Sequence, residues 1–245
     1  MSISIAIPSF NRSDFTIESF IQVLNNDLID DIVIVDDHSD IDIFIKLWNL
    51  VNELNSDKIK LFRNKKNLKP LLNKYEAVKN CKNDWAILLD SDNKIDNDYV
   101  EIVSKLDAEE DIIYCPELLY TLNKTVVWCS FKEFNYVITK KETNRNIEDG
   151  MFQTLLNTGN YFCNRKKYMD VKEDSYNASA LSANDAMYFS YAWLFNGNKI
   201  KVVPDLAYVH RQHGGGVGGS WYANNLDACL FATYAIIKKI KKWKV

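Results

Sequence analysis

"DWAILLDSDN", residues 84–93, is a short apolar run that ends in two carboxylates separated by one serine. Alternate side chains of an extended chain point the same way, so Asp90 and Asp92 can converge where the predicted strand ends. Carboxylates held that close repel each other unless a cation lies between them. A hard divalent cation that also binds phosphates accounts for the pair, and a polar turn is the plainer alternative.

Other short apolar, β-branched runs share the chain with this one, and helical patterns separate them. The runs cover residues 3–8, 31–37, 58–64 and 111–115. Residues 14–26 and 41–54 keep their large apolar side chains largely on one helical stripe. Strands that alternate with helices predict an α/β fold with a doubly wound, mostly parallel central sheet that helices cover on both faces.

Polar residues follow each of the first four runs. These segments are "PSFNR" (8–12), "DDHSD" (36–40), "RNKKN" (63–67) and "DSDN" (90–93). In open α/β sheets, ligands bind outside the carboxyl ends of the strands. Each segment alone is also ordinary turn chemistry. The four together, on one edge of the sheet, favour a ligand site.

Composition narrows the class of protein. The 245 residues are 47% hydrophobic and 26% charged, which suits one large domain with a real core. A net charge of -3 does not favour nucleic-acid binding. Five scattered cysteines without a C-x-x-C predict neither a disulfide framework nor a zinc site. Since we find no signal peptide and no run of roughly 18 apolar residues, we expect a cytoplasmic protein.

Three of the strand ends, taken in order, resemble the nucleotide-binding half of a family 2 glycosyltransferase with the GT-A fold. The family patterns IPxYN, DDxS and hydrophobic-D-x-D stand here as Ile7–Asn11, Asp36–Ser39 and Leu89–Asp92. Residues 71–93 also resemble the family's "LNKGLxxAxGxYIxxLDxDD", and the likeness extends from residue 3 to about residue 104. Glycines usual in the family are replaced by His38 and Tyr75 and are missing from 67–70.

The resemblance implies a set of donor-binding residues. Asp37 is implied to face the imide N–H of a nucleoside base, with Asp36 as the next candidate. Asp90 is implied to contact the ribose or a metal-bound water, and Asp92 to ligate Mn²⁺ or Mg²⁺ beside the leaving diphosphate. The other implied donor contacts are Pro8, Ser9, Asn11, Arg12, Asn67, Asn73 and Ser91. Arg12 is equally typical of an exposed surface arginine.

The catalytic base is expected in the second half of the chain. Residues 182–205 resemble the family's acidic motif at the start of a helix, with Asn184-Asp185 where Glu-Asp is common. The resemblance implies Asp185 as the general base that deprotonates an acceptor hydroxyl. An aspartate at a helix start is also explained by the helix dipole alone.

A histidine-rich and glycine-rich segment follows. Residues 208–221 resemble the "YRQHxxNVxG" that closes the catalytic domain in rhamnosyltransferase-like members, which implies His213 as a second metal ligand, with His210 as its rival. Imidazole beside carboxylate suits Mn²⁺ better than Mg²⁺. Five of the eight glycines lie directly after His213, which is typical of a flap over a ligand and of a flexible linker.

Two further segments bear on the acceptor. The aromatic residues of 128–136 suit stacking on a sugar ring as well as burial in the core: they are Trp128, Phe131, Phe134 and Tyr136. The resemblance places a turn at Gly159-Asn160 near the acceptor. "IIKKIKKWKV" (236–245) is typical both of a basic amphipathic helix on an anionic membrane and of an ordinary last helix with a solvated lysine face.

The resemblance as a whole implies an inverting, metal-dependent hexosyl- or deoxyhexosyltransferase. It would move a sugar from a UDP- or dTDP-sugar to a hydroxyl of a lipid-, polysaccharide- or protein-linked glycan by single displacement. We expect residues 1–104 to form the nucleotide-sugar-binding half, 105–222 the acceptor-binding and catalytic half of the same domain, and 223–245 a C-terminal basic amphipathic helix. The fold should include a smaller acceptor-side subregion.

Three alternatives stay open at this level. A haloacid-dehalogenase-like phosphatase also ends a strand in D-x-D, but a threonine normally follows where this chain has Asn93-Lys94. A sugar nucleotidyltransferase needs a glycine-rich, lysine-bearing loop after the first strand, where "PSFNRSD" stands here. A non-catalytic relative that binds glycans or nucleotide sugars is the third.

Overall fold

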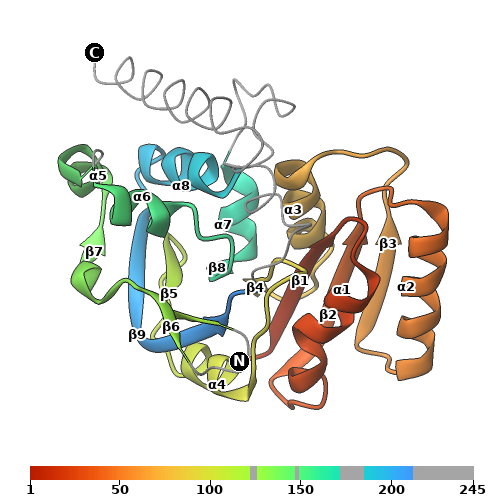
Figure 1. Ribbon diagram of the computed structural model, residues 1–245. Coiled ribbons are helices and arrows are strands. Elements are labelled where there is room, and N and C mark those ends of the chain that lie inside the picture. Colours follow the sequence, from red (N-terminus) through yellow and green to blue (C-terminus); the bar gives the residue numbers. More distant parts are fainter. Residues whose placement is uncertain (122–125, 147–148, 172–184, 212–245) are drawn as a thin grey trace.

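The computed structural model describes residues 1–121, 126–146, 149–171 and 185–211 (Figure 1). The elements follow in the order β1 (Ile3–Ser9), α1 (Ser13–Phe20), η1 (Ile21–Val23), β2 (Ile29–Asp36), α2 (Ile41–Leu54), β3 (Ile59–Arg63), α3 (Pro70–Lys79), β4 (Trp85–Leu88), α4 (Asn97–Ser104), β5 (Ile112–Tyr120), β6 (Val127–Ser130), η3 (Lys132–Phe134), β7 (Val137–Ile138), α5 (Lys140–Asn146), α6 (Gly150–Leu156), β8 (Tyr161–Asn164), α7 (Arg165–Asp170), α8 (Asp185–Phe195) and β9 (Lys199–Val209). His213, the glycines after it and residues 236–245 lie outside the described residues.

One mixed sheet organises the domain. Its strand order is β3-β2-β1-β4-β8-β5-β9-β7, and β6 pairs with β5. Strands β1 to β4 are parallel to one another, β5 is parallel to β9, and β8 runs antiparallel to β4 and β5. This arrangement confirms the predicted α/β fold with a mostly parallel sheet.

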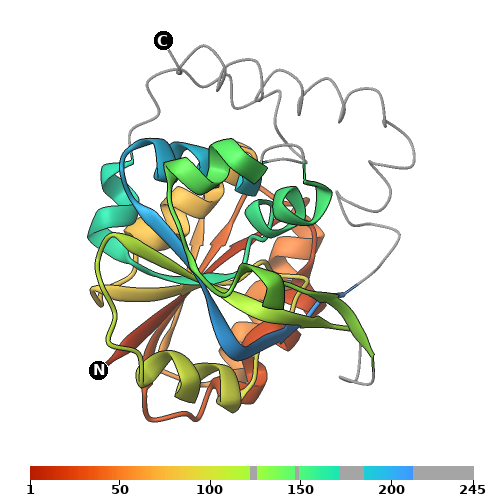
Figure 2. The same cartoon turned by 90° about the vertical axis from the view of Figure 1, so that its left-hand side faces the viewer.

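Helices cover both faces of the sheet. Figure 2 shows α3, α7 and α8 on one side and α4 on the other. Strand β1 is buried along its whole length, as expected for a strand covered on both faces. Strand β7 and helices α5 and α6 lie at the end of the sheet opposite β3 (Figure 1). Within the described ranges, no helix is long and apolar enough to cross a membrane.

The predicted elements agree with the structure except at their ends. Helix α2 has the predicted bounds, whereas the predicted helix 14–26 is divided into α1 and the tighter turn η1. Strand β5 extends to Tyr120, well beyond the predicted 111–115. The last part of β5 pairs with β9. Because this pairing joins residues far apart in the sequence, the local sequence pattern did not predict it.

Strand β9 bends back toward the strand ends of the first half. Asp205 has a φ of 62°, and its N–H donates to a carboxylate oxygen of Glu117 over 3.2 Å. After the bend, Val209 exchanges two backbone hydrogen bonds with Lys94, at 2.9 and 3.0 Å. The end of β9 therefore lies against the segment that follows the D-x-D, and Figure 1 shows it pointing toward β4.

The missing family glycines are tolerated in different ways. His38 and Lys69 adopt positive φ angles of 62° and 74°, so two loops keep a backbone shape that glycine adopts more easily. Tyr75 instead points into the core, where its ring lies 5.1 Å from Tyr168 and its hydroxyl donates to the Val171 carbonyl over 2.9 Å. These replacements change side-chain packing while the loops keep their course.

Candidate active site

The carboxyl ends of β1, β2 and β4 meet at one edge of the sheet. Ser9 pairs with Asp36 in the parallel register, and the Asp37 N–H donates to the Ser9 carbonyl over 2.8 Å. The Leu89 N–H donates to the Ala6 carbonyl over 2.9 Å. The structure therefore brings together the predicted polar segments 8–12, 36–40 and 90–93.

The acidic pair after β2 is turned into the protein. Asp36 accepts a hydrogen bond from the Ser39 N–H at 3.0 Å and a shorter one from the Ser39 hydroxyl. Asp37 accepts from the Leu68 N–H at 2.7 Å and the Lys69 N–H at 2.9 Å, with Asn64 as a third donor. Burial raises the pKa of Asp37, and these donors oppose the rise. Both carboxylates hold the loops around them in shape.

Several other predicted donor residues have the same structural task. Asn73 donates its side-chain N–H to the Val35 carbonyl over 3.1 Å and accepts from Asn64 at 3.0 Å. The Asn11 N–H donates to the Ser39 hydroxyl over 2.8 Å. The remaining candidates of this kind are Ser9, paired with the Thr16 hydroxyl, Asn67, which accepts from the Lys69 N–H, and the buried Pro8 and Ser91.

The acidic pair of the D-x-D has cationic partners. Lys74 Nζ lies 3.1 Å from Asp90 Oδ1, and Arg12 Nη1 lies 2.5 Å from Asp92 Oδ2. The Asp90 and Asp92 side chains are 27% and 17% exposed. Protein nevertheless surrounds the Asp90 carboxylate on most sides, and this burial raises its pKa, with Lys74 opposing and the neighbouring carboxylates adding to the rise. Both carboxylates remain within reach of a ligand.

Lys74 also contacts the predicted base. Its Nζ lies 2.8 Å from Asp185 Oδ2, at the first residue of α8, so one ammonium group joins Asp90 to Asp185. Burial lowers the pKa of Lys74, but the carboxylates of Asp185 and Asp90 outweigh it and raise the pKa above its ordinary value. Lys74 therefore stays charged between two buried acids.

The sequence analysis did not single out Lys74, although a signal was present. Leu71, Lys74 and Val78 follow one another at helical spacing on the buried side of α3. A lysine on the apolar stripe of a helix needs a buried anion to neutralise it, because an unpaired buried charge is strongly unfavourable. That stripe alone would have marked Lys74 as the partner of a carboxylate elsewhere in the chain.

The turn before β8 is pressed against the D-x-D. A Cβ atom on Gly159 would lie 2.2 Å from Asp90 Oδ2 and 2.9 Å from Lys74 Nζ, so a larger residue would displace these two side chains. The Asp90 N–H donates to the Asn160 side-chain oxygen over 2.7 Å. The segment predicted to lie near the acceptor therefore contacts Asp90 directly.

The bent end of β9 completes this edge. Arg211 donates from Nε to the Asp92 carbonyl over 3.2 Å and from its N–H to the Asn93 side-chain oxygen over 3.3 Å. The His210 ring stacks on Trp128, with the two ring centroids 4.5 Å apart. The chain thus leaves the described residues beside Asp92, two positions before the predicted ligand His213.

A divalent cation at this edge would need oxygen ligands from a bound substrate in addition to those of the protein. Among the described residues, no group of three or more His, Cys, Asp or Glu side chains could hold a metal ion. Asp92, with Asp90 beside it, offers carboxylate oxygens, the donors that hard cations prefer. A cation bound by one or two carboxylates and by substrate phosphates is the arrangement typical of Mg²⁺.

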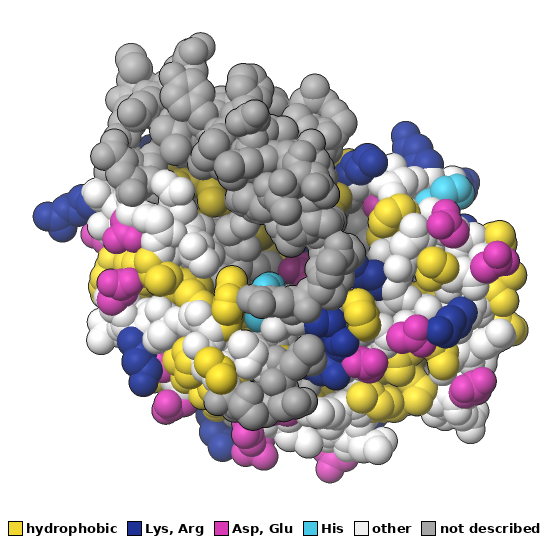
Figure 3. Space-filling model, viewed as in Figure 1, with side chains coloured by type: hydrophobic (Ala, Val, Ile, Leu, Met, Phe, Trp, Pro, Cys, Tyr) yellow, Lys and Arg dark blue, Asp and Glu magenta, His cyan; other side chains and the backbone are white. Residues whose placement is uncertain are grey.

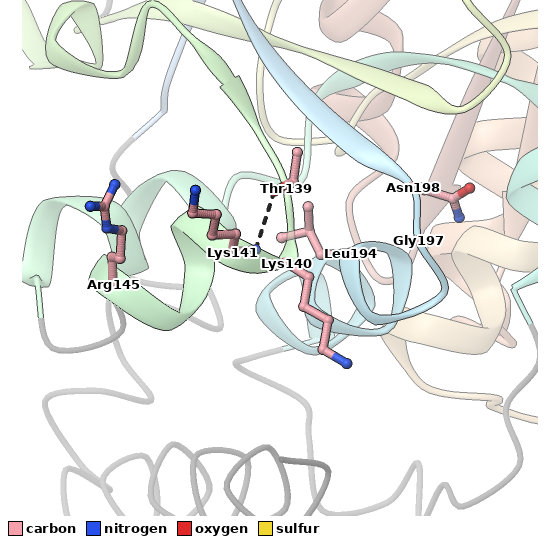
Figure 4. A pocket seen from close by; sticks show the side chains of 7 residues that line it. All are labelled: Thr139, Lys140, Lys141, Arg145, Leu194, Gly197 and Asn198. Carbon is pink, nitrogen blue, oxygen red and sulfur yellow. Dashed lines mark hydrogen bonds between the residues drawn. The ribbon is translucent and has the colours of Figure 1, made fainter. Parts of the chain in front are cut away.

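An open hollow of about 700 Å³ lies away from this edge (Figure 4). It is lined by Thr139, Lys140, Lys141, Arg145, Leu194, Gly197 and Asn198. Leu194 is near the end of α8 opposite Asp185, roughly 14 Å along the helix at its rise per residue. The hollow is therefore separate from the carboxylates at the strand ends.

The chain matches one protein family in sequence. The sequence pattern of the family described as Glycosyl transferase family 2 matches residues 4–174. A comparison with curated proteins finds no match.

Solved structures with a similar fold include TarS of S. aureus and GalNAc-T7. TarS 1–349 in complex with UDP has a TM-score of 0.62 and 16% identity over 87% of this chain and 61% of that one. TarS 1–349 with UDP-GlcNAc gives 0.61 and 16% over 88% and 60%. GalNAc-T7 with UDP, GalNAc and Mn²⁺ gives 0.63 and 16% over 86% and 43%. The chain therefore spans less than two thirds of these structures. It belongs to glycosyl transferase family 2 and has the GT-A fold.

Proposed function

We propose that this protein transfers a sugar from a nucleotide diphosphate sugar to a hydroxyl of a glycan acceptor, with inversion. The observation that carries the proposal is the ion-pair cluster Asp90–Lys74–Asp185, which sets a helix-start carboxylate beside the D-x-D at the strand ends. UDP in the names of the similar structures supports a UDP-sugar, with a dTDP-sugar as the alternative donor.

The reaction follows from the position of Asp185. Its carboxylate accepts the proton of the acceptor hydroxyl, and the oxygen attacks the anomeric carbon while the bond to the diphosphate oxygen breaks on the opposite face. Configuration inverts in this single displacement. Lys74, whose pKa the two carboxylates raise, contacts Asp185 Oδ2 at 2.8 Å and holds this carboxylate beside Asp90.

Asp92 is the residue that would hold a divalent cation, with His213 as a second ligand from outside the described residues. Such a cation would neutralise the diphosphate as it leaves. Mn²⁺ in the GalNAc-T7 structure supports this assignment, with Mg²⁺ as the alternative. Arg12, which contacts Asp92, is then placed next to the phosphates.

The donor-side loops would form the nucleotide slot. Asp36, Asp37, Asn67 and Asn73 shape its walls through the hydrogen bonds described above, and Ser9 and Pro8 provide its floor at the end of β1. Direct contact between Asp37 and a base stays a prediction. So does contact of residues 236–245 with a membrane that carries a lipid-linked acceptor.

The decisive experiment replaces Asp185 with asparagine, which keeps the shape and removes the basicity. We expect transfer to slow on the order of 100-fold or more, with UDP binding retained. Asp98→Asn is the matched control, because Asp98 also lies in the first turn of a helix but is exposed. If the two variants lose equally little activity, Asp185 serves only the helix dipole and the assignment is wrong.

A second measurement identifies the donor. Ligand binding raises the melting temperature by mass action, so we would screen UDP- and dTDP-sugars with and without Mn²⁺. We expect a cation-dependent rise for one donor. Stabilisation by a donor without any transfer to an acceptor would support the alternative of a non-catalytic relative.

A further inference from the structure

Trp128 is exposed although it lies in a stretch rich in buried aromatic residues. Phe131 and Phe134 of the same stretch are buried in the core, whereas 44% of Trp128 is exposed. Its indole ring stacks on His210 at 4.5 Å with an interplanar angle of 19°. No other described aromatic ring contacts it. His210 thus covers one face of the indole, and 44% of the Trp128 surface stays exposed.

Contacts through His210 link Trp128 to the edge of the sheet that carries the D-x-D. Strands β5 and β9 are parallel to each other, and the His210 N–H donates to the Tyr120 carbonyl at the end of β5 over 2.8 Å. The next residue, Arg211, donates to the Asp92 carbonyl. Trp128, His210, Arg211 and Asp92 therefore form a continuous chain of contacts.

An exposed indole ring favours a ligand with an apolar face. Val126, two residues before Trp128 in the chain, is also exposed, at 59%. Figure 3 shows hydrophobic side chains reaching the surface on the side of the molecule that carries β6 and β7. A pyranose ring presents a face of C–H groups, which packs well on the electron-rich face of an indole. An open-chain polyol has no such flat face.

We propose that Trp128, oriented by His210, is the stacking platform for a pyranose ring of the acceptor. This inference rests on the proposed function and names the class of its acceptor: a glycan that presents a pyranosyl residue next to the D-x-D. Trp128 holds the ring, while the acceptor hydroxyl extends toward Asp185. His210 is a positioning residue, since it acts through the indole.

The test is binding of simple pyranosides in the presence of UDP and Mn²⁺, measured by saturation-transfer NMR. The probes are the methyl pyranosides of glucose, galactose, N-acetylglucosamine and rhamnose, with ribitol as the open-chain control. We expect at least one pyranoside to receive saturation from the full-length protein. Trp128→Ala should bind it roughly tenfold more weakly, and Trp128→Phe should recover much of the loss.

Val127→Ala is the matched control, because Val127 is an exposed neighbour on the same strand whose side chain points to the other face. It should bind the pyranoside like the unaltered protein. His210→Ala should weaken binding less than Trp128→Ala, and His210→Tyr should restore it, because a flat ring again supports the indole. A purely structural role of His210 would not distinguish alanine from tyrosine in this way.

Several results would overturn the platform. They are equal binding of ribitol, equal pyranoside binding by Trp128→Ala, or no binding of any pyranoside while UDP still raises the melting temperature. If UDP with Mn²⁺ fails to stabilise even the unaltered protein, the proposed function fails first. The UDP-induced rise in melting temperature, measured on every variant, also shows that each one is folded.

Discussion

Two pairs of aspartates lie at neighbouring strand ends of the same sheet edge, and their partners differ. Asp36 and Asp37, after β2, are almost fully buried and accept hydrogen bonds from backbone N–H groups and uncharged side chains. Asp36 also has a cationic neighbour, since Arg63 Nε lies 3.5 Å from its Oδ2. Asp90 and Asp92, after β4, are partly exposed and pair with Lys74 and Arg12.

The difference shows that residue type and strand position do not decide what a carboxylate does. Backbone N–H groups hold both buried carboxylates, from Ser39 in the same loop for Asp36 and from Leu68 and Lys69 in a different loop for Asp37, so this pair serves the scaffold. A cationic side chain is a mobile partner that a metal ion or a phosphate can replace or join. The pair after β4 is therefore suited to binding, and three sets of substitutions test the contrast.

The largest effect is expected from Lys74→Met, which removes the charge that neutralises Asp90 and Asp185. Breaking a buried ion pair from one side typically destabilises a protein by about 3–5 kcal/mol. Lys79→Met on the same helix is the control, because its ion pair with Glu76 is exposed and should contribute less than about 1 kcal/mol. The free energy of unfolding in urea measures both.

The decrease in the free energy of unfolding caused by Lys74→Met should also depend on pH. Burial already raises the pKa of Asp90 in the folded protein, and removing Lys74 removes the main opposing effect. An acid whose folded-state pKa is raised destabilises the protein where it is ionised, and this penalty disappears as pH falls through that pKa. The defect should be smaller at pH 5 than at pH 8. A pH-independent defect would show that Lys74 matters for packing alone.

The next effect separates the two acidic pairs by matched substitutions. Asp92→Asn should lower Mn²⁺-stimulated transfer on the order of 100-fold and change the free energy of unfolding by less than about 1 kcal/mol. Asp37→Asn should destabilise by about 1–3 kcal/mol, because its new amide N–H group faces the donors of residues 64–69. Transfer assays with and without Mn²⁺ and unfolding curves give both quantities.

The opposite pattern would break this contrast. If Asp37→Asn abolishes transfer at unchanged stability, Asp37 contacts the nucleotide directly, as the sequence resemblance implied. If Asp92→Asn retains full Mn²⁺ stimulation, the cation is held elsewhere.

The smallest effect concerns the loop that carries the scaffold pair. His38 has a φ of 62°, a conformation that disfavours side chains with a Cβ. His38→Gly should therefore be more stable than His38→Ala by about 1 kcal/mol, since both lose the ring contact with the Asn64 carbonyl and only glycine relieves the backbone. Thermal unfolding of the two variants measures this difference in stability. Equal melting temperatures would mean that the loop shifts to accommodate alanine.

The strands and the ligand edge were predictable because their signals are local. Apolar runs such as 31–37 bury both faces of a parallel strand, and polar residues must follow where such a strand ends. Motif order predicted the family, and the family match covers residues 4–174, which include Asp90 and Asp92. Asp185 lies beyond the match, and its role stays a prediction. The bounds of β5 and the bend at Asp205 were missed, since both depend on pairing between distant strands.

By itself, the sequence determined that this chain is an α/β protein of the GT-A type with acidic strand ends on one edge, because hydrophobic period and motif order are written along the chain. Only the tertiary structure decided the direction of each side chain at that edge. It turned Asp37 toward residues 64–69, joined Asp90 to Asp185 through Lys74, and left Trp128 exposed while burying Phe131. Those outcomes depend on which charges and surfaces meet in space. Contacts between segments that are distant in the sequence produce no local sequence pattern, so they cannot be predicted from it.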